Sequence, residues 1–403
     1  MPLIEMDFLK ESDRLMIDRV KTTDLKVGMY IDRIEASWFK HPFFLNHFVI
    51  RAEAEIKKLI ESKIETVYVD FEKSTHLSEN RNGKARVPFG QEIERSKAIY
   101  QESRLAIQEL MQDTKMGKNI NCPQLYQLVG NMTDSIFRNS QALLSLSRLK
   151  DYDKYLYSHS INTCILCLSI AREIDMDPDE VMSLGIGSLL HDIGLMKIPQ
   201  HLLQESYSPT VQEENLIKKH PDYSAEILRE TEGITEDVVL MAQNHHEKYN
   251  GDGYPRGLAG RSIGTFGLII RIADFYDHIT SKWRKHEAVL PFEAIKMILE
   301  RSQTDFSPLY AAKFVQCLGI YPIGTLVELN THEIGIVMEI NPQDVMRPRV
   351  LVLTDPHCLP LKEKILVDLT DPDQDTQQKE IIRPLNPRLL GIDPEEYVAH
   401  YQG

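Results

Sequence analysis

The sequence is short of cysteine, of positive charge and of long apolar runs, and each shortage excludes a class of protein. Five cysteines are an odd number in a 403-residue chain, so the disulfide framework of a small secreted domain is not expected. Lysine and arginine total 46 against 60 aspartates and glutamates, which gives a formal net charge of −14. We therefore expect no binding of duplex nucleic acid through general phosphate neutralisation. An anionic substrate would need cations placed locally.

Membrane association is not expected either. The most apolar stretch, Cys164 to Ala171, is far shorter than the roughly 20 residues that span a bilayer. The segment from Met1 to Lys10 is partly acidic and has no long apolar run, unlike a secretory signal. These features predict a cytoplasmic protein with reduced cysteines. Cys164 and Cys167 form a C-x-x-C motif inside an apolar helical run, so we expect them to pack in the core.

The length suggests two or three domains at roughly 150 residues per domain. Residues 1–90 combine strand-like segments with a helix at Glu53 to Ser62, and they end in a polar stretch typical of a linker. We expect a small mixed α/β domain there, with a regulatory or dimerisation role. Its partner would be a second copy of the chain or a signalling protein.

The remaining chain divides into a helical part and a β-rich part. Residues 91–319 show apolar positions at spacings of three and four, as in Leu125, Leu128 and Met132, which predicts an all-α domain. After Gly319, short β-type runs alternate with Asn-Pro, Arg-Pro and Asp-Pro breaks. The overall prediction is a multidomain protein with a helical bundle at 91–319 and a small β-rich extension at 320–403.

Ionisable side chains occur within or directly after apolar runs of the helical part. His191 and Asp192 follow Ser188-Leu189-Leu190, and Asp274 lies inside the run from Ile269 to Phe275. Burial of such groups is costly unless they are paired or bind a metal ion. The same region holds four further candidate ligands, His159, His220, His245 and His246.

These residue types favour a pair of divalent metals. Imidazole and carboxylate together suit Fe, Mn, Zn, Ni or Co, and a carboxylate can bridge two cations. A metal pair makes hydroxide at neutral pH and neutralises a phosphoryl transition state. Phosphodiester hydrolysis is therefore the natural candidate reaction. Taken singly, each histidine could instead be an ordinary hydrogen-bonded residue.

Several separated segments then form a recognisable set, in order along the chain: His159-Ser160-Ile161-Asn162, His191-Asp192-Ile193-Gly194, Ile198-Pro199, His220-Pro221, His245-His246-Glu247, Asn250-Gly251-Asp252-Gly253-Tyr254-Pro255 and Asp274-Phe275-Tyr276-Asp277. Across roughly residues 130–319, this set closely resembles the HD-GYP family of cyclic-dinucleotide phosphodiesterases. The resemblance implies an all-α bundle of the HD type. It also implies a substrate such as cyclic di-GMP or 3',3'-cyclic GMP-AMP, opened to a linear dinucleotide.

The resemblance also implies roles for individual residues. One metal would be held by His159, His191, Asp192 and Asp274, and the second by Asp192 as a bridge with His220, His245 and His246. His191 and Asp192 would form the catalytic doublet, and hydroxide held between the metals would attack phosphorus in line. Two ions are expected, with Fe or Mn as first candidates and Ni, Co or Zn as alternatives.

Gly253, Tyr254 and Pro255 predict a substrate-binding lip, since glycine permits a tight turn and the tyrosine ring can stack on a base. Following His245-His246-Glu247 so closely, this segment is interpreted as more than a surface turn. For Glu247 itself we expect a role in orienting a histidine ring, with an exposed helical residue as the alternative.

The chain departs from the family pattern at three places. Leu195 occupies the position of a lysine that polarises the scissile phosphate. Lys197 is the candidate to replace it, with a solvent-facing lysine as the alternative. Tyr155 stands where members with a third metal carry glutamate, which is why two metals are expected. Trp283 stands at a usual arginine position, so Arg284 and Lys285 become the candidates for phosphate contact.

Two alternatives to a cyclic-dinucleotide phosphodiesterase stay open at this point. An HD hydrolase could act on another nucleotide or phosphoester, because the metal ligands alone do not select a substrate; the Gly253-Tyr254-Pro255 segment argues against this. A catalytically weak member could bind the dinucleotide as a signalling scaffold. The intact ligand set argues against a scaffold, whereas Leu195 and Trp283 favour one.

Overall fold

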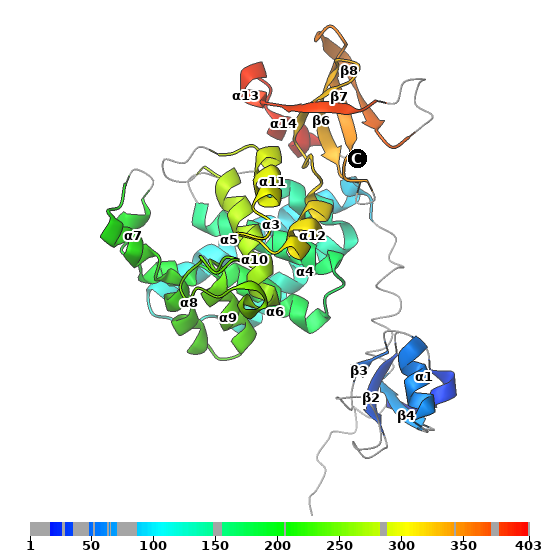
Figure 1. The fold of residues 1–403 in the computed structure, drawn as a ribbon, viewed down its shortest axis with the longest axis vertical. Helices are drawn as coiled ribbons and strands as arrows, with labels where there is room; N and C mark the ends of the chain where they lie inside the picture. The colour runs from blue at the N-terminus through cyan, green and yellow to red at the C-terminus, as the bar shows by residue number, and fades with distance from the viewer. Residues whose placement is uncertain are drawn as a thin grey trace, which may run out of the picture. The chain divides into compact units, whose positions relative to one another are not determined.

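A computed structural model describes residues 17–25, 29–34, 48–50, 53–62, 64, 66–70, 87–147, 155–204, 207–282, 288–341, 344–371 and 379–401. The chain divides into two compact units, Met1–Arg86 and Val87–Gly403, which are coloured from blue to red along the sequence in Figure 1. Within the described ranges, no helix combines the length and apolarity needed to cross a membrane.

The described residues of the first unit form a small antiparallel sheet and the helix α1. The strand order is β1-β4-β2-β3, and its buried side chains include Ile31, Leu59 and Val67. The elements are β1 (Ile17–Lys21), η2 (Thr22–Asp24), β2 (Tyr30–Ile34), β3 (Phe48–Val49), α1 (Glu53–Glu61) and β4 (Thr66–Asp70). The helix α1 lies where the sequence predicts it.

The second unit begins with a helical bundle, as the spacing of apolar residues predicts. Proline at the first turn and a polar residue just before it start several of these helices, for example Asp177 and Pro178 at α6. The elements are α3 (Phe89–Lys115), α4 (Cys122–Leu146), α5 (Tyr155–Glu173), α6 (Pro178–Leu190), η5 (Ile193–Lys197), η6 (Gln200–Leu203), α7 (Val211–Ile217), α8 (His220–Arg229), α9 (Glu236–Asn244), η7 (Gly260–Ile263), α10 (Thr265–Thr280), α11 (Pro291–Glu300) and α12 (Pro308–Leu318).

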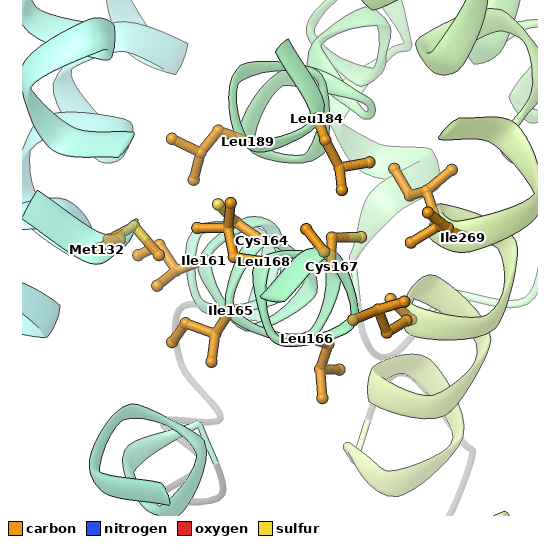
Figure 2. Packing of buried hydrophobic residues seen from close by; sticks show 14 of the residues in the cluster. Met132, Ile161, Cys164, Ile165, Leu166, Cys167, Leu168, Leu184, Leu189 and Ile269 are labelled. Atoms are coloured by element: carbon orange, nitrogen blue, oxygen red, sulfur yellow. The ribbon is translucent and has the colours of Figure 1, made fainter. Parts of the chain in front are cut away.

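Helix α5 forms the centre of the bundle. Every residue from Ser158 to Ala171 is buried, because this helix is apolar on all sides and is covered by its neighbours. Figure 2 shows Leu184 and Leu189 of α6 on one side of α5, with Met132 and Ile269 on two others. Cys164 and Cys167 point into this packing and are fully buried free thiols. The prediction that they are core residues is confirmed.

A five-stranded antiparallel sheet follows the bundle, in agreement with the predicted β-rich extension. The strand order is β8-β7-β6-β5-β9. Strand β9 contains Pro384, which is tolerated because β9 lies at an edge of the sheet. The elements are β5 (Leu326–Leu329), β6 (Ile334–Glu339), β7 (Arg349–Thr354), β8 (Pro360–Asp368), β9 (Ile381–Leu385), α13 (Pro387–Leu390) and α14 (Pro394–His400).

The sheet and the bundle are joined by specific contacts. The Gln141 side chain of α4 donates to the carbonyl of Ile340 at 2.8 Å and accepts from the N–H of the same residue at 3.0 Å. Tyr401 packs against Phe89, the first residue of α3, with ring centroids 5.2 Å apart. The β-rich part is therefore packed onto the helical domain.

Candidate metal centre

The predicted ligands converge at one end of the bundle. They come from α5, from the C-terminal ends of α6 and α9, from the start of α8, and from α10. Their side chains are buried or nearly so. All seven predicted ligands lie in this cluster: His159, His191, Asp192, His220, His245, His246 and Asp274.

Close helix packing brings these ends together. Gly187 of α6 lies against Met241 of α9; a Cβ at position 187 would lie 2.5 Å from the methionine sulfur. His191 and His245 are the C-terminal caps of those two helices, and their ring centroids are 4.9 Å apart. Because the C-terminal end of a helix carries partial negative charge, both ends favour a cation.

Gly194 permits a second close approach, between η5 and α8. A Cβ on Gly194 would lie 2.1 Å from the carbonyl oxygen of His220, so no larger residue fits. Ser224 secures the contact by accepting from the Gly194 N–H at 2.9 Å and donating to the His191 carbonyl at 2.7 Å. The glycine after the His-Asp doublet therefore has a packing role that places His191 and His220 in one site.

Three of the histidines have the same hydrogen-bonded orientation. In each, Nδ1 lies 2.6–2.8 Å from a backbone carbonyl oxygen. A carbonyl only accepts, so Nδ1 carries the proton and Nε2 presents a lone pair to the centre of the cluster. The pairs are His191 with Ser188, His220 with Ile217, and His245 with Ala242.

Asp192 lies between two groups of ligands. Its Oδ1 is 3.1 Å from His220 Nε2 and 3.4 Å from His245 Nε2. Its Oδ2 is 3.5 Å from His191 Nε2 and 3.8 Å from His159 Nε2. The candidate ligand atoms accordingly form two sets, each of which includes Asp192. One carboxylate can therefore serve both sets.

The donors in this cluster fit divalent metal ions. His191 Nε2 is buried and has no hydrogen-bond partner. The buried Asp192 Oδ1 faces the Nε2 atoms of His220 and His245, which carry no proton in the tautomer described above, so it too lacks a donor. A buried polar atom left unsatisfied costs about 1–3 kcal/mol. Imidazole nitrogen with carboxylate oxygen is the donor set of Fe, Mn, Ni, Co and Zn sites. Metal coordination would satisfy both atoms.

Burial and charge set the protonation of the cluster. Burial lowers the pKa of His191 to about 4, so its ring is neutral at pH 7. Burial also acts to lower the pKa of His159, but the neighbouring carboxylates of Asp274 and Asp277 outweigh it and raise the value to about 10. Burial alone would raise the pKa of Asp192, yet the surrounding histidines, His191 first, hold it well below its usual range.

Asp277 is a site residue that the sequence reasoning missed. It accepts from His159 Nδ1 at 2.8 Å and from Asn162 Nδ2 at 3.0 Å. Asn162 in turn accepts from the Tyr100 hydroxyl at 3.0 Å. This series of hydrogen bonds runs from Tyr100 of α3 to the predicted ligand His159 and orients its ring. The sequence could have indicated Asp277 by its spacing, because Asp274 and Asp277 are three residues apart and lie on one face of α10.

The predicted lip, Gly253–Pro255, lies beside the cluster. The Tyr254 ring is 4.7 Å from the His246 ring, and Lys218 Nζ is 5.8 Å from the Tyr254 ring. Gly253 is required by space, since a Cβ there would lie 2.2 Å from the Lys248 nitrogen. The predicted substrate-binding lip is therefore next to the predicted metal ligands.

Glu247 holds this loop in place. Its side chain is fully buried, and its two oxygens accept from the backbone N–H groups of Arg256 at 2.7 Å and Leu258 at 3.0 Å. The expectation that Glu247 orients a histidine ring is replaced by this observation. The carboxylate satisfies the backbone of the loop that carries Tyr254.

Comparison with known proteins bears on the whole chain. Residues 132–308 match the HD domain family. The chain is 30% identical over 398 residues to a cyclic di-GMP phosphodiesterase of Pseudomonas aeruginosa, an alignment that covers 94% of this chain and 93% of that protein. The chain belongs to the HD-GYP family.

Other matches fall on the parts beside the HD domain. Residues 17–125 match a domain of unknown function, and residues 326–388 match a KOW domain associated with the HD domain.

A 3'3'-cGAMP-specific phosphodiesterase of Vibrio cholerae is 32% identical over 141 residues, which is 35% of this chain and 32% of that protein. A solved structure described as an HDG"Y"P protein from Bdellovibrio bacteriovorus aligns over 74% of this chain and 98% of its own, with 20% identity and a TM-score of 0.47.

The departures from the HD-GYP pattern have definite surroundings. Leu195 is 7% exposed and packs with Ile198 and Leu202 in a small apolar cluster. Lys197 is 45% exposed and forms an ion pair with Glu226 at 2.9 Å. The position of the usual lysine is therefore part of an apolar cluster in this chain.

Two further departures complete the comparison with the HD-GYP pattern. Tyr155 lies beside the cluster, with its ring stacked on that of His159 at 5.2 Å and its hydroxyl 2.9 Å from His278 Nδ1. Trp283, Arg284 and Lys285 lie outside the described residues. The predicted role of Arg284 and Lys285 in phosphate contact stays a prediction.

Proposed function

We propose that this chain is a metal-dependent phosphodiesterase that opens a cyclic dinucleotide, cyclic di-GMP or 3',3'-cyclic GMP-AMP, to its linear form. The observation that carries the proposal is the pair of ligand sets that share Asp192. The names of the relatives in Pseudomonas and Vibrio support the two substrates. The lip at Gly253–Pro255 favours a substrate whose bases can stack on Tyr254, and this argues against an HD hydrolase of other phosphoesters.

The proposed metal ligands are the seven residues of the cluster, with two divalent ions per chain and Fe or Mn as first candidates. Such ions, when bound, lower the pKa of water and neutralise charge on the attacking and leaving oxygens of a phosphodiester. His191, His220 and His245 contribute Nε2 atoms fixed by their Nδ1 hydrogen bonds to carbonyls. Asp192 and Asp274 contribute the negative charge that retains the cations.

The chain's own residues also position the substrate in this proposal. Tyr254 presents a ring next to His246, on which a purine can stack; each such stack contributes about 1–3 kcal/mol. Glu247 keeps the loop ordered before substrate arrives. Pro255 limits the flexibility of the lip because its φ angle is fixed.

The test is turnover by protein with a measured metal content. The chain is purified anaerobically, its metals are counted by mass spectrometry, and it is incubated separately with the two cyclic dinucleotides while linear products are followed by chromatography. We expect about two metals per chain and turnover of at least one substrate. Asp192→Asn, which removes the shared carboxylate, should lower metal content and reduce turnover by about 10²-fold or more. Full metal loading without turnover of either substrate would instead favour the scaffold.

A further inference from the structure

Arg271 is a largely buried cation on the helix that carries Asp274. The two residues are three apart on α10 and share a face of the helix. The Arg271 side chain is 12% exposed, and its Nη1 lies 3.7 Å from Asp274 Oδ2. Its Nε is buried and has no hydrogen-bond partner. An unsatisfied buried N–H is unfavourable, so this guanidinium still has hydrogen-bonding capacity to offer.

Two aromatic rings hold the guanidinium in this place. Arg271 Cζ lies 5.7 Å from the centre of the Phe275 ring and 5.5 Å from that of Phe306. The two rings are themselves 5.0 Å apart, and Phe306 is buried. Cation–π contact with packed rings restricts the guanidinium but offers it no carbonyl or carboxylate oxygen. Its position is therefore fixed while its donors are not all used.

The charge around Arg271 changes when a metal binds. In the part of the chain that the structure describes, Asp274 is the one carboxylate within 4.0 Å of Arg271. Asp274 also faces His159 Nε2 at 3.1 Å and His246 Nδ1 at 3.6 Å. Once this carboxylate serves as a metal ligand, its charge is shared with the cation, and Arg271 lies beside additional positive charge. An anionic phosphate oxygen is the group that restores the balance.

The segment that follows the His-Asp doublet offers the site no unpaired cation among its described residues. Leu195 lies in an apolar cluster, and Lys197 pairs with Glu226. We propose that Arg271 donates charge-assisted hydrogen bonds to a phosphate oxygen of the substrate. This assignment rests on the proposed function. It makes Arg271 a substrate-binding residue next to the metal ligands.

The test compares two substitutions of Arg271 with a matched control. Arg271→Met keeps most of the packing stem and removes the charge, whereas Arg271→Lys keeps the charge and loses the planar fork. The control is Arg301→Met, because Arg301 also lies over Phe275, at 5.3 Å, but is 44% exposed and pairs with Asp305. Each metal-loaded variant is assayed for KM with the cyclic dinucleotide, for affinity to the linear product by calorimetry, for metal content and for Tm.

We expect Arg271→Met to weaken product binding and raise KM by about 10-fold or more, as loss of a hydrogen bond to a charged group predicts. Metal content should stay unchanged, Arg271→Lys should recover part of the loss, and Arg301→Met should behave as wild type. Wild-type affinity in Arg271→Met would overturn the assignment. A loss of metal that parallels the loss of affinity would also overturn it, because Arg271 would then act only by supporting Asp274.

Hydrolysis of a generic phosphodiester distinguishes a failure of the Arg271 assignment from a failure of the proposed function. If the metal-loaded wild type hydrolyses bis(p-nitrophenyl) phosphate but neither cyclic dinucleotide, the proposed function is wrong. The KM values of the three variants for that diester then decide the role of Arg271. If the loaded wild type hydrolyses no diester at all, the proposed function is overturned, and the calorimetric affinities of the three variants for the linear dinucleotide decide the role of Arg271.

Discussion

The ring of His159 is held by the carboxylate of Asp277, which accepts a hydrogen bond from His159 Nδ1 at 2.8 Å. The contact leaves Nε2 facing Asp192 and Asp274. Because the second carboxylate oxygen accepts from Asn162, Asp277 serves two donors at once. A metal-binding imidazole supported in this way has a fixed tautomer and a more basic Nε2.

Asp277→Asn should therefore weaken metal binding without removing a ligand. An amide has one acceptor oxygen, so one of the two donors loses its partner. We expect the metal dissociation constant to rise about 10- to 100-fold, the usual effect of losing an outer-shell partner. Equilibrium dialysis with metal analysis measures it. Thr280→Val, one turn further along α10, is the control and should bind metal as the wild type does.

Tyr254→Ala should raise KM for the cyclic dinucleotide while metal content stays the same. Loss of one stacked base predicts an increase of about 5- to 100-fold. Tyr254→Phe keeps the ring beside His246 and should show a smaller effect. Steady-state kinetics with metal counting on both variants decide the point. An equal loss of turnover with a minimal phosphodiester would show that Tyr254 does not act on the bases.

Glu247→Gln should loosen the loop that carries the lip. The glutamine side chain has a single acceptor oxygen for the two backbone N–H groups of Arg256 and Leu258. Losing a charge-assisted buried hydrogen bond costs about 1.5–3 kcal/mol. We expect a lower Tm by calorimetry and faster hydrogen exchange at residues 256–258. Unchanged protection at those amides would contradict the role given to Glu247.

Leu195→Lys is expected to destabilise the protein more than it restores activity. Leu195 is 7% exposed and packs with Ile198 and Leu202, so an ammonium group at this position would be buried in a mainly apolar cluster. Large destabilisations arise from such unpaired buried charges. Chemical denaturation should show a loss of about 2 kcal/mol or more. Leu195→Met, which conserves volume, should lose less than about 1.5 kcal/mol.

Three members of the ligand cluster could be predicted from their local setting in the sequence, and the other four from the resemblance to the HD-GYP family. His191, Asp192 and Asp274 are ionisable residues inside or next to apolar runs, and such positions need a compensating partner. The helical bundle and the β-rich part follow from a change in apolar period near Gly319. What these signals share is that they are local, so they can be recognised without knowing which helices meet.

The contacts that the sequence did not reveal depend on residues far apart in the chain. Lys197 was a candidate for the substrate, but it pairs with Glu226 of α8. Glu247 was assigned to a histidine, but its partners are backbone groups of a loop whose path no pattern specifies. Arg271 shares its helix with Asp274, yet its second ring, Phe306, comes from another segment. Tertiary packing decides all three.

The reactivity of the buried cysteines at the centre of the bundle can be used to measure how often the core opens. Cys164 and Cys167 are fully buried, and burial raises the pKa of both thiols, that of Cys167 to about 12. Alkylation requires an exposed thiolate, so these two sulfurs can be labelled only in molecules whose core has transiently opened. Cys358 is exposed and labels at once, which gives every sample its own reference. Peptide mass spectrometry separates Cys164 and Cys167 from the other free thiols, Cys122 and Cys317. The rate at which Cys164 and Cys167 become labelled then reports how often the helical core beneath the His-Asp cluster opens.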